Sequence, residues 1–145
     1  MRILAVDYGE ARTGLACCDA YESIASPVGT VCEWNRDACA AKIAAKAAEL
    51  GTELIVVGLP VNMDGSCGER AKRCEEFAAS LRELTGLEVE LWDERVTTVQ
   101  AIGILNETNV RGKKRKAVID TVAATLILES YLSYRKKKSG SKQQV

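Results

Sequence analysis

The carboxylate of Asp7 lies at the end of the first apolar segment of the chain. Residues 3–6 form an unbroken apolar run, which is typical of a strand buried on both faces. Gly9 and Gly14 permit a tight turn after this strand, and a second apolar run follows at residues 15–18. Because ligands collect at the carboxyl ends of strands in open α/β sheets, Asp7 is a candidate catalytic residue. The alternative is that Asp7 only orders the turn.

Two further positions can bring carboxylates to the same site. Asp93 and Glu94 follow a predicted half-buried strand at residues 88–92, and alternation along a strand sends their side chains to opposite faces. Asp120 precedes apolar residues at three, four and seven positions further on, so it belongs to the inward face of the predicted last helix. An inward carboxylate is costly unless it is paired or binds a cation. The alternative for Asp120 is an acid that interacts with the dipole at the helix N-terminus.

The absence of histidine restricts the chemistry that these acids can support. It excludes Ser-His-Asp catalysis, Cys-His catalysis and every metal site with histidine ligands. Three converging carboxylates instead suit one or two Mg²⁺ or Mn²⁺ ions, which prefer oxygen ligands and leave positions open for phosphate. Such ions activate water and stabilise the leaving oxygen of a phosphodiester. The acids therefore predict metal-dependent phosphodiester hydrolysis.

Positive charge is concentrated towards the end of the chain. The sequence has 20 Lys and Arg and 20 Asp and Glu, but residues 111–145 hold ten of the basic residues and only two acids. An acidic body with a basic final quarter indicates a local contact with a polyanion. The consecutive bases Lys113, Lys114, Arg115 and Lys116 precede the helix that carries Asp120, so we expect them to bind nucleic-acid phosphates. The alternative is a solvated loop.

The size of the chain, 145 residues, predicts one domain over residues 1–138 and a disordered tail at 139–145. No apolar stretch approaches the length of a transmembrane helix, and the start does not resemble a signal peptide. We therefore expect a cytoplasmic protein that does not contact membranes. The six cysteines form no CxxC pair, which favours free thiols in a reducing compartment.

The elements that must position the acids follow from apolar periodicity. Strands are expected at residues 3–6, 15–18, 24–31, 53–57 and 88–92, and helices at 36–50, 69–84, 97–106 and 117–134. Asn35 can cap the first helix, and Pro27 favours an edge position or a bulge for the third strand. The strand–helix–strand order implies a right-handed crossover with parallel pairing, and hence an α/β fold.

Several motifs together resemble the YqgF/RuvX family. They are Asp7-Tyr8-Gly9 with Arg12 and Gly14, Gly58-Leu59-Pro60 with residues 62–66, Asp93-Glu94-Arg95 with Thr97-Thr98, and Asp120 with Ala123-Ala124 after the basic run. The resemblance covers nearly the whole chain in order. It implies an RNase H-like fold, with a five-stranded mixed sheet (three antiparallel strands, then two parallel ones) flanked by helices. It also implies a metal-dependent nuclease that matures the 5′ end of pre-16S ribosomal RNA or resolves Holliday junctions.

The resemblance assigns the metal-binding set by position. It implies that Asp7, one acid of the Asp93-Glu94 pair and Asp120 are catalytic and bind Mg²⁺ or Mn²⁺. Of the pair we favour Glu94 for its longer reach, and Asp93 stays a candidate ligand.

Four polar residues of the motifs are candidates for substrate binding. Arg12 and Arg95 can hold the scissile phosphate bidentately, or can simply neutralise the acids. Asn62 and Ser66 can touch phosphate, although turn formation explains them equally well.

The preferred substrate is single-stranded RNA bound by a monomer, with the ribosome or its precursors as a partner. A junction resolvase is normally a symmetric dimer with a broad basic face, and RuvC-type resolvases carry acids where this chain has residues 58–60 and Ala123. The alternatives are a dimeric Holliday junction resolvase acting on DNA and a non-catalytic RNA-binding factor in ribosome assembly. An Asp-x-Gly turn also occurs in actin-like ATPases, but these need two such domains.

Overall fold

The elements follow the expected order along the chain. A computed structural model describes residues 1–59, 68–93 and 122–136. The described elements are β1 (Ile3–Asp7), β2 (Arg12–Cys18), β3 (Ala25–Cys32), α1 (Arg36–Leu50), β4 (Leu54–Leu59), α2 (Glu69–Thr85) and β5 (Glu88–Asp93). A last helix, here called the C-terminal helix, runs over the described residues 122–136. The expected helix at 97–106 and the expected tail at 139–145 lie outside the described residues.

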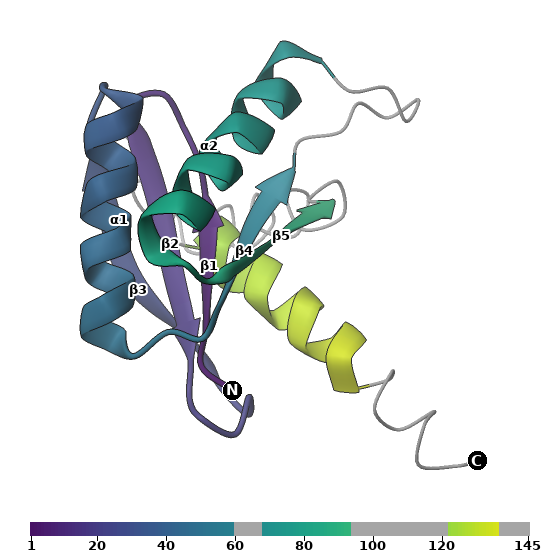
Figure 1. Cartoon of the computed structure of the whole chain (residues 1–145). Coiled ribbons are helices and arrows are strands. Elements are labelled where there is room, and N and C mark those ends of the chain that lie inside the picture. Colours follow the sequence, from purple (N-terminus) through teal and green to yellow (C-terminus); the bar gives the residue numbers. More distant parts are fainter. Residues whose placement is uncertain (60–67, 94–121, 137–145) are drawn as a thin grey trace, which may run out of the picture.

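The strands form a five-stranded sheet in the order β3-β2-β1-β4-β5, with β1 at its centre (Figure 1). β1 pairs with β2 and β2 pairs with β3 in antiparallel fashion, whereas β4 is parallel to both β1 and β5. This confirms the predicted mixed sheet. β3 lies at an edge, as Pro27 indicates, and its register with β2 shifts between Leu15 and Ala16.

Local signals account for most boundaries. The side chain of Asn35 accepts a hydrogen bond from the Ala38 amide at 2.9 Å, which caps α1 as expected. Gly51 ends α1 in a left-handed conformation, with φ of 68°. β4 runs two residues beyond the predicted strand because Gly58 and Leu59 pair with Trp92 and Asp93 of β5. Pairing, rather than local apolarity, sets this end of the strand.

Helices cover both faces of the sheet (Figure 1). On one face, α1 and α2 bury alternate residues of the central strands, among them Leu4, Val6, Ile55 and Val57. On the other face, the C-terminal helix packs against the intervening residues, such as Ile3 and Ala5. The central strands are buried on both faces, which is the reason for their unbroken apolar runs.

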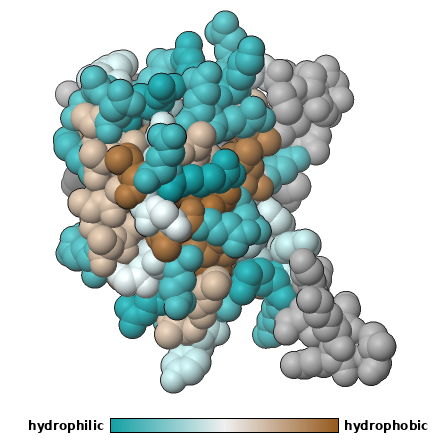
Figure 2. Space-filling model, in the orientation of Figure 1, coloured by the Kyte–Doolittle hydropathy of each residue, from teal (hydrophilic) through white to brown (hydrophobic). Residues whose placement is uncertain are grey.

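The surface over α1 and α2 is mainly hydrophilic, with apolar colour over α1 and between the two helices (Figure 2). The five cysteines that the structure describes are free, in agreement with the prediction, and only Cys32 among them is exposed. None of the helices in the described ranges has the length and apolarity needed to cross a membrane.

Polar contacts attach the C-terminal helix to the rest of the fold at two points. The Tyr131 hydroxyl donates a hydrogen bond to the Glu90 carboxylate of β5. Further along the helix, Arg135 Nε donates to Glu22 Oε1 at 2.5 Å, and the N-terminal ammonium lies 3.5 Å from Glu22 Oε2. The hydrogen bond from Arg135, together with its positive charge, holds the pKa of Glu22 below its ordinary value.

The Glu22–Arg135 contact predicts a specific loss of stability in acid. A carboxyl group whose pKa is depressed in the folded state contributes stability above its unfolded pKa, about 4.3, and loses it as the pH falls through the folded pKa. Glu22→Gln is therefore expected to lower the free energy of unfolding by about 1 kcal/mol at pH 7, and by much less at pH 3. Urea unfolding of the wild type and of Glu22→Gln at both pH values measures this difference in the free energy of unfolding.

Glu49→Gln is the matched control, because Glu49 is an exposed glutamate whose ion pair with Lys46 joins neighbouring turns of one helix. It should change stability little at either pH. An equal loss for Glu22→Gln at pH 7 and pH 3 would show that the charge of Glu22 does not act as described.

Candidate active site at the carboxyl edge of the sheet

Asp7 ends the central strand and is half-buried. Its side chain follows the alternation of β1, in which Ile3 and Ala5 face the C-terminal helix while Leu4 and Val6 face α1 and α2. Asp7 therefore belongs to the face that the C-terminal helix covers. Its place at the carboxyl end of the central strand agrees with the prediction from sequence.

The turn after Asp7 is held in a tight conformation. Thr13 of β2 is fully buried, and its hydroxyl lies 3.4 Å from both the amide nitrogen and the carbonyl oxygen of Gly9. A Cβ atom at Gly9 would lie 2.3 Å from the carbonyl oxygen of Arg12, so only glycine fits this position. Arg12 itself begins β2 and is half-buried, so it lies beside the same turn. The turn thus brings a cationic residue to the edge at which β1 ends.

The second predicted acid position falls at the end of β5. In this strand Glu90 and Trp92 face the C-terminal helix: Glu90 accepts the hydrogen bond from Tyr131, and the Trp92 ring packs edge-on against Tyr131 at 5.4 Å. Val89 and Leu91 instead pack in the core under α1 and α2. Asp93 follows the alternation of Val89 and Leu91, so it belongs to the face opposite to that of Asp7.

β4 separates these two acid-bearing strands, and its last two residues, Gly58 and Leu59, bear no carboxylate. Within the described ranges, no three acidic or cysteine side chains are grouped as potential metal ligands. Glu94 and Asp120, the other acids of the predicted set, lie outside the described residues.

The C-terminal helix presents the inward stripe that the sequence predicts. Ala124, Ile127, Leu128 and Tyr131 are buried against the sheet face to which Asp7 belongs. Asp120 would extend the same stripe by helical spacing, but it lies outside the described part of the chain. So do the other predicted substrate-binding residues, which are Asn62, Ser66, Arg95, Lys113, Lys114, Arg115 and Lys116.

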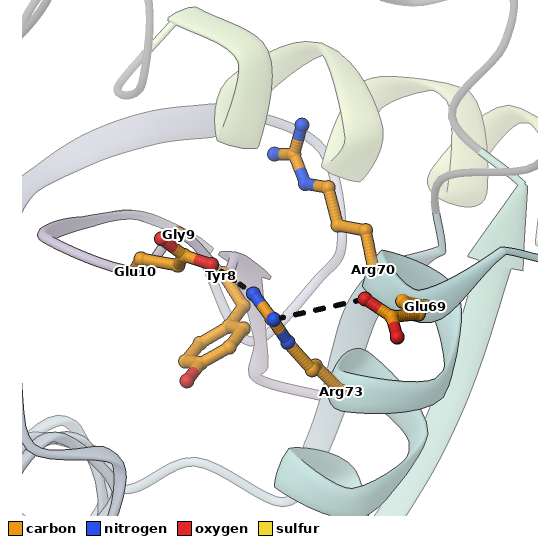
Figure 3. A pocket seen from close by; sticks show the side chains of 6 residues that line it. All are labelled: Tyr8, Gly9, Glu10, Glu69, Arg70 and Arg73. Atoms are coloured by element: carbon orange, nitrogen blue, oxygen red, sulfur yellow. Dashed lines mark hydrogen bonds and ion pairs between the residues drawn. The ribbon is translucent and has the colours of Figure 1, made fainter.

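A pocket of about 470 Å³ opens beside the turn that follows Asp7. Figure 3 shows its six lining residues: Tyr8, Gly9 and Glu10 from the turn, and Glu69, Arg70 and Arg73 from the first turns of α2. Apart from the Tyr8-Gly9 motif, sequence reasoning missed these residues. Glu10 and Arg73 are 63 positions apart and form an ion pair only because α2 begins at the edge where β1 ends.

Tyr8 lies on the α1–α2 side of the sheet. Its ring stacks on Phe77 of α2, with ring centroids 4.1 Å apart. Burial is the main cause that raises the pKa of Tyr8, so the hydroxyl stays protonated and can donate a hydrogen bond.

The arrangement of the sheet and helices is similar to that of two proteins solved in complex with Holliday junctions. Thermus thermophilus RuvC, solved in complex with a Holliday junction substrate, matches with a TM-score of 0.52 at 14% identity, over 88% of this chain and 91% of that chain. The fowlpox virus resolvase in complex with Holliday junction DNA gives a TM-score of 0.56 at 12% identity, over 92% of this chain and 98% of that chain. At such identities the likeness shows the fold alone, which is the RNase H-like fold of RuvC-type resolvases.

Sequence comparison identifies the family within this fold. The family model described as "RuvX: Holliday junction resolvase" matches residues 1–134. Relatives named "Putative pre-16S rRNA nuclease" include one from Lachnospira eligens, which is 44% identical over 140 residues, covering 94% of this chain and all of the relative. Another, from Halothermothrix orenii, is 39% identical over 140 residues, covering 97% of this chain and all of the relative. The chain belongs to the RuvX family, so the resemblance seen in its motifs is confirmed.

Proposed function

We propose that this protein is a divalent-metal-dependent endonuclease that processes the 5′ end of pre-16S ribosomal RNA in the cytoplasm. The observation that carries the proposal is the half-buried carboxylate of Asp7 at the carboxyl end of the central strand, in a member of a resolvase family. The names of relatives at about 40% identity support the RNA substrate.

The residues fit a hard divalent cation. Asp7 supplies an oxygen ligand on the sheet face that the C-terminal helix covers. By helical spacing in the sequence, Asp120 belongs to the buried stripe of that helix. A bound Mg²⁺ or Mn²⁺ supplies Lewis-acid chemistry, by lowering the pKa of water and balancing charge on the phosphate. In the proposed site Asp7, Glu94 and Asp120 are the ligands.

The strand alternation favours Glu94 over Asp93 as the second ligand. Asp93 belongs to the α1–α2 face, whereas Asp7 belongs to the opposite face. Because successive residues of a strand alternate, the residue after Asp93 is the one that the pattern assigns to the face of Asp7.

The chain's cationic residues bind and orient the substrate in this proposal. Arg12, beside the turn after Asp7, and Arg95 hold the scissile phosphate. The bases at residues 113–116 bind the backbone of a single strand, and Asn62 and Ser66 add polar contacts to phosphate.

RNA rather than a DNA junction is favoured by the distribution of charge. The first 110 residues carry more acids than bases, so a broad basic face suited to a four-way junction is absent from the sequence pattern. In the described part of the chain, the end of β4 bears no acid, and Ala123 occupies the helix position where RuvC-type resolvases carry one. A monomer that holds one flexible strand fits these features.

A comparison of substrates tests the proposal. The purified protein should cleave single-stranded RNA that carries a structured end, in the presence of Mg²⁺ or Mn²⁺ and not in EDTA, and should sediment as a monomer. Duplex RNA and a synthetic four-way DNA junction serve as the comparison substrates. Paired symmetric nicks in the junction with RNA left intact, together with a dimer in sedimentation, would favour the resolvase instead. Tight RNA binding with no cleavage in either metal would favour a non-catalytic assembly factor.

A further inference from the structure

The pocket beside the turn after Asp7 has no role in the site described so far. It is directly adjacent to that site, because its residues Tyr8 and Gly9 follow Asp7 in the chain. It opens on the α1–α2 side, where the side chain of Tyr8 lies against Phe77. A nucleic-acid strand that crosses this edge of the sheet at Asp7 would therefore contact the pocket next.

Two arginines from consecutive turns of α2 give the pocket its cationic groups. Arg73 reaches across to the turn and forms an ion pair with Glu10, and its other terminal nitrogen lies 4.0 Å from Glu69 Oε2 (Figure 3). Arg70 extends away from this chain of charges, and it forms no ion pair with any residue that the structure describes. Arg70 is exposed, so its guanidinium is available to an anion.

The remaining lining groups are an aromatic ring, backbone and two carboxylates. The ring of Tyr8 is held in place by stacking on Phe77, and its hydroxyl lies at the end of the ring that points away from Arg70 (Figure 3). Gly9 contributes no side chain to the pocket, so the turn lines it there with backbone atoms. Both carboxylates oppose anion binding: Glu10 competes directly for Arg73, and Glu69 lies 4.0 Å from the same guanidinium.

We propose that this pocket binds a backbone phosphate of the nucleic-acid strand, next to the scissile bond at Asp7. Arg70 and Arg73 are the phosphate-binding residues, and Arg73 exchanges its contact with Glu10 for the phosphate. A planar guanidinium is matched to the oxygens of a phosphate, and two of them on one helix bind it from one side. This inference rests on the proposed function, because it places the strand by the position of Asp7.

The test compares four substitutions by binding of a fluorescein-labelled single-stranded RNA in EDTA, where no cleavage occurs. Arg70→Gln and Arg73→Gln should each weaken binding about fivefold at low salt, and should reduce the slope of log affinity against log salt by about 0.7. Lys72→Gln is the matched control, because it removes the same charge from an exposed position on α2 that does not line the pocket. It should leave both the affinity and the slope close to those of the wild type. Glu10→Gln should act in the opposite direction and tighten binding about twofold to fivefold.

The outcomes separate this inference from the proposed function. If the wild type cleaves RNA in Mg²⁺ but the two arginine variants bind RNA as Lys72→Gln does, the pocket is not a phosphate site and the nuclease proposal stands. If the arginine variants lose affinity while the wild type cleaves nothing, the pocket contacts nucleic acid and the nuclease proposal fails. Weaker RNA binding by Glu10→Gln would contradict the proposal that Arg73 exchanges its contact with Glu10 for a phosphate. Unchanged melting temperatures for all four variants exclude unfolding as the cause.

Discussion

Asp7→Asn is expected to abolish cleavage while the protein stays folded. The amide has nearly the volume of the carboxylate but lacks the charge that a divalent cation needs, so the loss should exceed the roughly 100-fold typical of residues that only support metal ligands. Single-turnover cleavage of RNA in Mg²⁺ measures the effect. A second readout does not depend on catalysis: Mg²⁺ should raise the melting temperature of the wild type but not that of Asp7→Asn.

Asp37→Asn is the matched control for this experiment. Asp37 is an exposed aspartate in the first turn of α1, and its substitution makes the same chemical change away from the proposed site. It should retain both cleavage and the stabilisation by Mg²⁺. Wild-type cleavage by Asp7→Asn would show that the carboxylate at the end of β1 is not a metal ligand.

Glu94→Gln and Asp93→Asn should differ sharply although the two acids are adjacent. Asp93 follows the face of Val89 and Leu91, which pack under α1 and α2, while Asp7 follows the opposite face. We therefore expect Glu94→Gln to lose cleavage as Asp7→Asn does, and Asp93→Asn to stay within about threefold of the wild type. The same single-turnover assay measures both variants.

Each of these two variants is the other's control, since both remove one carboxylate at adjacent positions of the sequence. The stabilisation by Mg²⁺ should be lost only in Glu94→Gln. A loss of cleavage in Asp93→Asn with normal activity in Glu94→Gln would reverse the assignment of the second ligand.

Much of the fold could be predicted from the sequence because it depends on local patterns. The helix at residues 36–50, its cap at Asn35 and the edge position that Pro27 gives to β3 are all confirmed. The apolar stripe of α2 is likewise buried, including Cys74 and Phe77. These features require only the helical or strand repeat and the neighbouring residues, so the chain itself contains the information.

The sequence also identified Asp7 as the acid at the end of a central strand, and strand alternation predicts opposite faces for Asp93 and Glu94. It did not determine which of those faces is that of Asp7. That depends on the parallel register from β1 through β4 to β5 and on the choice of helices for each face. Register and layer packing are contacts between distant segments, which no local repeat contains.

The pocket beside Asp7 was decided by tertiary structure alone. Glu10 and Arg73 have nothing in their sequence neighbourhoods to indicate an ion pair, and Arg70 resembles any other exposed arginine of a surface helix. They line one pocket because β4 is parallel to β1 and ends at the same edge of the sheet, so that α2, which follows β4, begins there. The residue types at the edge where β1 ends follow from the sequence, whereas their neighbours across that edge follow from the way the sheet is connected.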